Sequence, residues 1–203
     1  MRKIYLNVFA FLLAWGVVSA HAIPVLTYDG TLSYDAATGG LSVSSVLTGT
    51  QNIMPAPQLL GSSMSFNAVL SSVDTSNSFF TIGNFAGVAG TDDLSVSDGS
   101  PNLLLTADFV SLDMRGVNGW DQGTMSGLIS ATGGSLASMF GQGNLIALNF
   151  NLTTVFDPAM FNSGFTGSID GRIVGTVPEP GPMALLGLGL VLVGAVRVLR
   201  TVG

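Results

Sequence analysis

Short stretches of residues 23–176 alternate between apolar and polar side chains, and this alternation is the feature that most restricts the fold. It runs through residues 26–35, 64–71, 110–115, 146–153 and 165–173. Successive side chains of a β-strand point to opposite faces of the sheet, so a period of two indicates strands with one buried and one solvated face. The middle of the chain is therefore predicted to be all-β.

Turn-forming residues separate these stretches. Residues 35–40, Asp-Ala-Ala-Thr-Gly-Gly, lie between two alternating runs and predict a hairpin loop. Clusters of Gly, Pro, Asn and Asp follow at intervals along the chain, and only residues 135–140 have a locally helical pattern. Eight to ten short strands at this spacing predict an antiparallel β-sandwich or jelly roll over residues 23–176.

Two Asp-Gly pairs are open to two interpretations. Asp29-Gly30 and Asp170-Gly171 each have the composition of a tight hairpin turn. The alternation nevertheless continues through both pairs without a break. We therefore expect both glycines to lie inside strands.

The charge of the middle region limits its partners. Between Ile23 and Val177 the chain has eleven Asp and two Arg, with no Glu, Lys or His, so its formal charge is about minus nine. Such a surface repels phosphate backbones and anionic lipid headgroups, which argues against binding to nucleic acid. The chain has no Cys, which excludes disulfides and thiolate zinc sites.

The N-terminus has the three parts of a secretory signal peptide. Arg2 and Lys3 precede an apolar run over residues 4–18, and Ala20 and Ala22 have the spacing of a cleavage site. This pattern predicts a signal peptide over residues 1–22, which signal peptidase removes before Ile23. The alternative is an uncleaved N-terminal anchor.

The C-terminus combines a proline-rich segment, an apolar run and two arginines. As a helix, residues 183–199 would be about 26 Å long, close to the ~30 Å of a hydrocarbon core. The run predicts a single transmembrane helix over about 183–199, with Arg197 and Arg200 on the cytoplasmic side and the β domain outside. The alternative is a buried C-terminal core helix.

This tail resembles the PEP-CTERM sorting domain. The matching features are Val177, Pro178, Glu179 and Pro180, then the apolar run, then Arg197 and Arg200, within residues 177–203. The resemblance implies a Gram-negative bacterium that makes exopolysaccharide, and an exosortase-type enzyme that processes the tail. It also implies an intermediate anchored in the inner membrane, followed by transfer to the cell surface or extracellular matrix.

Few residues of the middle region suit catalysis. A serine nucleophile needs a base such as His or Lys, and the one histidine, His21, lies in the signal peptide. A pair of aspartates could still serve a glycan hydrolase. We expect a non-enzymatic protein with a structural or adhesive role.

Two groups of residues are candidate ligand sites. Asp92, Asp93 and Asp98 are candidate calcium ligands, because calcium prefers carboxylate oxygens. Trp120, with Asn118 and Asp121 beside it, is a candidate contact for a sugar ring; the alternative places Trp120 at the end of the core. A calcium-assisted carbohydrate-binding module of the exopolysaccharide matrix is thus the alternative function, and calcium is the only cofactor that the sequence suggests.

Overall fold

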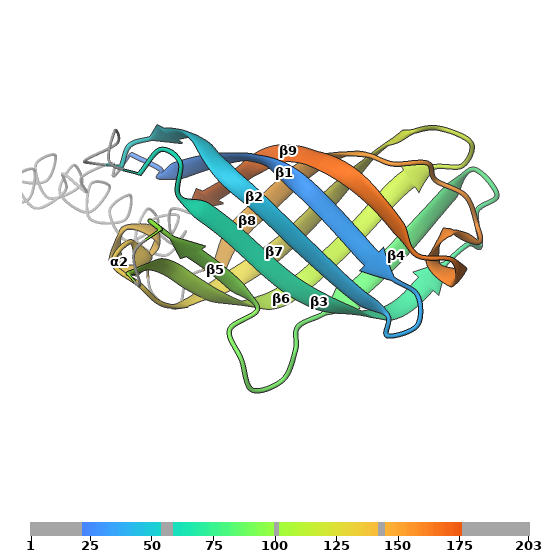
Figure 1. Cartoon of the computed structure of the whole chain (residues 1–203), viewed down its shortest axis with the longest axis horizontal. Coiled ribbons are helices and arrows are strands. Elements are labelled where there is room, and N and C mark those ends of the chain that lie inside the picture. The colour runs from blue at the N-terminus through green and yellow to red at the C-terminus, as the bar shows by residue number, and fades with distance from the viewer. Residues whose placement is uncertain (1–21, 54–58, 100–101, 142–144, 176–203) are drawn as a thin grey trace, which may run out of the picture.

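The computed structural model describes residues 22–53, 59–99, 102–141 and 145–175 (Figure 1). The strands are β1 (Val25–Asp35), β2 (Gly40–Gln51), β3 (Ser63–Asp74), β4 (Phe80–Ala86), β5 (Leu94–Ser97), β6 (Leu103–Val117), β7 (Gln122–Gly133), β8 (Leu145–Thr153) and β9 (Phe165–Gly175). Within these residues, two single-turn helices accompany the strands, α2 (Ala137–Phe140) and the 3₁₀ turn η2 (Met160–Asn162).

The strands form one antiparallel sheet that closes on itself. The ladder runs β2-β1-β9-β8-β7-β6-β4-β3, and β2 also pairs with β3 from Gly40↔Val69 to Val46↔Ser63. The first and last strands, β1 and β9, lie side by side from Val25↔Val174 to Tyr34↔Phe165. The result is a closed barrel, which leaves no free sheet edge in the ladder.

The predicted sandwich or jelly roll is therefore wrong. The five alternating stretches were nevertheless predicted correctly, since each of them lies in a β-strand. Sandwiches and barrels both need one apolar face per strand, so alternation alone does not separate them. The β2–β3 pairing separates them, because it joins the two ends of what would otherwise be an open sheet.

Strands β4 and β5 share one position in the barrel. Both pair with β3 and with β6, β4 in one half of the wall and β5 in the other. Residues 87–93 leave the wall between them as a loop, visible at the lower edge of Figure 1. The buried carboxylate of Asp93 holds this loop, because it accepts hydrogen bonds from the N–H groups of Val88 (2.6 Å) and Phe109 (2.8 Å).

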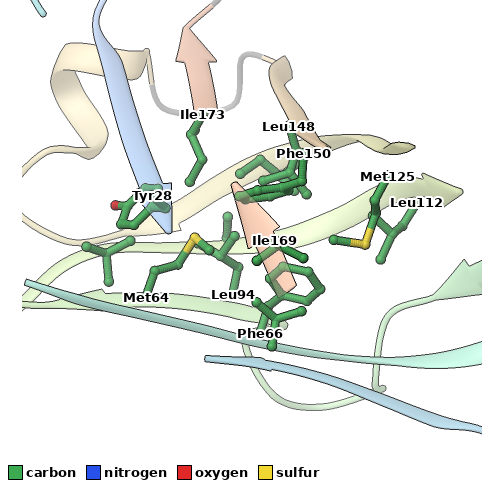
Figure 2. Close-up of a cluster of buried hydrophobic side chains, with 14 of the residues drawn as sticks. Tyr28, Met64, Phe66, Leu94, Leu112, Met125, Leu148, Phe150, Ile169 and Ile173 are labelled. Carbon is green, nitrogen blue, oxygen red and sulfur yellow. The ribbon is translucent and has the colours of Figure 1, made fainter. Parts of the chain in front are cut away.

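Apolar side chains fill the interior. Tyr28, Phe66 and Phe150 are among the largest side chains with almost no exposed surface. Figure 2 shows side chains from several strands meeting in this core, among them Met64, Leu94, Leu112, Met125, Leu148, Ile169 and Ile173. The barrel is therefore a packed body, and most of its polar residues lie on the outside.

Short segments cover both ends of the barrel. At the end where β1 begins and β9 stops, Leu136, Ala137 and Phe140 of the β7–β8 connection are buried. At the opposite end, the β8–β9 connection buries Phe156 and Phe161. The ring of Phe161 lies against Gly83, where an added Cβ would stand 2.4 Å from the ring.

Several local predictions are confirmed. Residues 35–40 form the β1–β2 turn, where Asp35 accepts hydrogen bonds from the Ala37 N–H (2.9 Å) and the Thr38 hydroxyl (3.0 Å). Gly30 and Gly171 lie inside β1 and β9, as expected. The helical pattern at residues 135–140 corresponds to α2.

The predicted targeting segments lie almost wholly outside the described residues. This applies to Ala20 and the rest of residues 1–21, to Val177–Pro180, to the helix at about 183–199 and to Arg197 and Arg200. Ala22 and Ile23 are described and form no regular structure. Among the helices that the structure does describe, none has the length and apolar character needed to cross a membrane.

Replacing Asp93 with Ala should destabilise the protein. The change leaves the N–H groups of Val88 and Phe109 without their acceptor, so we expect the free energy of unfolding to fall by about 2 kcal/mol. Urea unfolding measures the change. The control is Asp108→Ala, which removes an exposed aspartate of β6 and should shift stability by at most about 0.5 kcal/mol. Equal effects of the two variants would contradict the role of Asp93.

Replacing Tyr28 with Phe should stabilise the protein. The Tyr28 hydroxyl is buried and has no hydrogen-bond partner among the described residues, so its removal should raise the free energy of unfolding by about 1 kcal/mol. Burial also raises the pKa of Tyr28 in the folded state. The wild type should therefore lose stability as the pH rises above about 10, where an exposed tyrosine ionises, and the variant should lose less. A less stable variant in urea unfolding would indicate a bonded hydroxyl.

Candidate functional site

Two depressions adjoin on the outer wall of the barrel. One, of about 490 Å³, lies over β1, β9, β8 and β7. The other, of about 520 Å³, continues over β7–β9 to the β6–β7 turn, where Trp120 lines it. They share Thr124, Asn151 and Asp170, and we name the combined surface the outer groove. Each volume falls within the range of small-molecule sites, about 300–1,000 Å³.

Strand pairing arranges the polar side chains of the outer groove in two rows. Residues opposite one another in a ladder point to the same face, so each row crosses four neighbouring strands. One row is Thr124, Asn151, Asp170 and Asp29, and the other is Ser126, Asn149, Arg172 and Thr27. Three inter-strand spacings of ~4.8 Å make each row about 15 Å long.

Some of these side chains already have partners. Asn151 donates a hydrogen bond to Asp170 (3.0 Å), and Ser126 donates one to Asp113 (3.1 Å). Within the described part of the chain, the side chains of Asn149 and Thr124 have no hydrogen bond. Over the described residues, the outer groove therefore has polar side chains without a hydrogen bond, such as Asn149 and Thr124, beside others that are already bonded.

Charge is distributed unevenly along the outer groove. Asp29 and Asp170 stand directly opposite one another on β1 and β9, an unfavourable pairing of like charges. Arg172 lines the groove and makes no ion pair within the described residues. The other cation of the barrel, Arg115, lies over the ring of Phe80, 4.5 Å from its centroid. The groove thus has two carboxylates and one guanidinium.

A glycine pair and a buried phenylalanine position Trp120 at one end of the groove. Gly116 and Gly123 face each other on β6 and β7, and the ring of Phe156 occupies the space that their side chains would need. The Phe156 N–H donates to the Trp120 carbonyl (2.9 Å), and the Phe156 carbonyl accepts from Gly119 (2.8 Å). The β6–β7 turn is fixed to the core in this way, while the Trp120 side chain stays 63% exposed.

The structure separates the three residues predicted to contact a ligand. Trp120 lines the outer groove, and it does not lie at the end of the core. Asn118 instead accepts a hydrogen bond from the Thr81 hydroxyl (2.6 Å) and donates one to the Ser78 carbonyl (2.9 Å), so its amide links the β6–β7 turn to the β3–β4 connection. Asp121 is exposed in the same turn and does not line the groove.

The predicted calcium ligands do not converge. Asp93 is buried and bonded to backbone amides, whereas Asp92 is exposed and accepts a hydrogen bond from Thr132 (2.6 Å). Asp98 follows β5 and is exposed. In the described ranges, no three His, Cys, Asp or Glu side chains group closely enough to hold a metal ion. Calcium binding remains a prediction.

The sequence did not indicate most residues of the outer groove. Asn149, Asn151 and Arg172 are polar positions of the alternating stretches at residues 146–153 and 165–173, and many other residues have the same pattern. What distinguishes them is the adjacency of β1 and β9, which are more than a hundred residues apart in sequence. A local pattern does not contain that pairing.

Comparison with known proteins identifies the tail. Residues 176–200 match the family model of the PEP-CTERM protein-sorting motif. No curated protein and no solved structure matches the chain. The resemblance seen at residues 177–180 is confirmed: the chain contains a PEP-CTERM sorting motif, which supports an exported protein sorted through its C-terminal tail and implies processing by an exosortase-type enzyme.

Replacing Phe156 with Ala should release the Trp120 turn and weaken the fold. The ring is fully buried against Gly116 and Gly123, so the free energy of unfolding should fall by about 3 kcal/mol. Chemical unfolding measures the loss, and acrylamide quenching reports the mobility of Trp120. The adjacent Val155 is 66% exposed, so Val155→Ala should change stability by less than about 0.5 kcal/mol. Similar losses for both variants would contradict this role of Phe156.

Proposed function

We propose that this exported protein is a non-enzymatic adhesive protein of the cell surface or extracellular matrix, and that its outer groove holds a component of that matrix. The observation that carries the proposal is the groove itself, a polar surface about 15 Å across with an exposed Trp120 at one end. A protein that binds an extended polymer needs such an open surface rather than an enclosed chamber.

The packing of the barrel supports this proposal. Its interior is occupied by side chains such as Tyr28, Phe66 and Phe150, and both ends are covered by buried residues. A partner is therefore expected on the outer wall. The residue types of the middle region support a non-enzymatic role, since it has no His, Lys, Glu or Cys.

The direction of the chain in the barrel also supports an adhesive role. Strand β9 ends at Gly175, immediately before the sorting tail in sequence. The β6–β7 turn with Trp120 lies at the other end of the barrel, on the right in Figure 1. A barrel attached through its C-terminal tail would present Trp120 on the side away from the attachment point.

Co-sedimentation with extracellular matrix tests the proposal. The purified protein is mixed with matrix isolated from the producing cells, and the fraction that sediments is measured. We expect the wild type to sediment and Trp120→Ala to remain largely in solution. Phe79→Ala is the matched control, because Phe79 is a 71% exposed aromatic on a neighbouring connection and does not line the groove.

Two results would contradict the proposal. A wild-type protein that stays in solution would exclude an adhesive role towards this matrix. Release of soluble fragments from the matrix, abolished by Asp29→Asn or Asp170→Asn, would show an Asp-dependent hydrolase instead.

A further inference from the structure

We infer that the ligand of the outer groove is a carboxylate-free polysaccharide, with one pyranose ring packed on Trp120 and neighbouring rings bonded to the rows of polar side chains. The inference rests on the proposed function and names the chemical class of its ligand. It follows from the shape of the groove, its hydrogen-bonding groups, its aromatic residue and its charge.

The shape favours a chain molecule. The two depressions are continuous through Thr124, Asn151 and Asp170, and together they extend from Trp120 to Arg172. The two depressions together lie over four strands, β7, β8, β9 and β1, and are open to solvent along the wall. A single small molecule would occupy only one of the two depressions, whereas a linear oligomer can fill both.

The hydrogen-bonding groups favour a hydroxyl-rich ligand. Asn149 and Asn151 each carry an amide with both donor and acceptor atoms, and Thr124, Ser126 and Thr153 carry hydroxyls. A sugar hydroxyl also donates and accepts, so it can bond to any of these groups. A purely apolar ligand would leave them without partners, at a cost of ~1–3 kcal/mol for each desolvated group.

Trp120 supplies the apolar contact that such a ligand needs. Trp120 is 63% exposed, and backbone hydrogen bonds to Phe156 and Val117 keep the residue in the β6–β7 turn at the end of the groove. One face of a pyranose ring consists of C–H groups, which pack well on the electron-rich face of an aromatic ring. A tryptophan side chain has only two torsion angles to order, so it loses little conformational freedom on binding.

The charge excludes polyanions and favours neutral or amine-bearing sugars. Asp29 and Asp170 oppose each other within the groove, and the barrel as a whole has a formal charge of about minus nine. A polyuronate would place carboxylates beside these residues, with only Arg172 to offset the repulsion. An ammonium group on the sugar would instead relieve the repulsion between the two aspartates.

Oligosaccharide titration tests the inference. The protein purified from the cells that export it is titrated with three hexasaccharides: N-acetylated chitohexaose, which is uncharged, its de-N-acetylated cationic form, and an anionic oligogalacturonate. Binding is followed by calorimetry and by Trp120 fluorescence. We expect the uncharged and cationic forms to bind, the cationic form more tightly at low salt, and the anionic form not to bind.

Matched variants locate the site. Trp120→Ala should weaken binding about tenfold and Asn149→Ala about fivefold, which correspond to losses of about 1.4 and about 1 kcal/mol of contact. Phe79→Ala and Asn67→Ala change an exposed aromatic and an exposed asparagine outside the groove, so both should bind as the wild type does. If Trp120→Ala or Asn149→Ala binds the oligosaccharide as tightly as the wild type does, the proposed location of the site is wrong.

The same titrations separate the ligand class from the proposed function. Failure of all three oligosaccharides to bind, or binding of the oligogalacturonate alone, would overturn the ligand class. If the protein still sediments with matrix in a Trp120-dependent manner, the adhesive role stands with another ligand. If it does not sediment either, both proposals fail.

Discussion

Closure of the sheet through the β1–β9 and β2–β3 ladders is the constraint on which the rest of the structure depends. It joins the first strand to the last, so every apolar face turns inward and every polar face turns outward. The same closure brings Asp29 beside Asp170 and Thr27 beside Arg172. The packed interior and the outer groove are therefore two consequences of one set of strand pairings.

Glycines in the wall allow aromatic rings to complete the core at the end that carries Trp120. Phe156 lies on Gly116 and Gly123, and Phe161 lies on Gly83. A side chain at any of these positions would displace the ring, and displacement of Phe156 would also break its two hydrogen bonds to the β6–β7 turn. The backbone of the turn that carries Trp120 is thus fixed by core packing, which links the stability of the barrel to the shape of the groove.

Local features of the structure could be predicted from the sequence, whereas long-range pairings could not. The alternating stretches, the turn at residues 35–40, the strand positions of Gly30 and Gly171 and the sorting motif all depend on neighbouring residues, and each was predicted correctly. The barrel was mistaken for a sandwich because both have the same alternation. Of the residues proposed for ligand contact, only Trp120 lines the groove, since Asn118 is used to link two turns.

The central claim is that the outer wall over β7, β8, β9 and β1 is the binding surface of this exported protein. Mapping of backbone amide chemical shifts during titration with uncharged chitohexaose tests it most directly. The account predicts shifts concentrated around Trp120, Thr124, Asn151 and Arg172, with the core residues unaffected. Shifts concentrated on β3, β4 and β6, or the absence of any shift at saturating ligand, would contradict it.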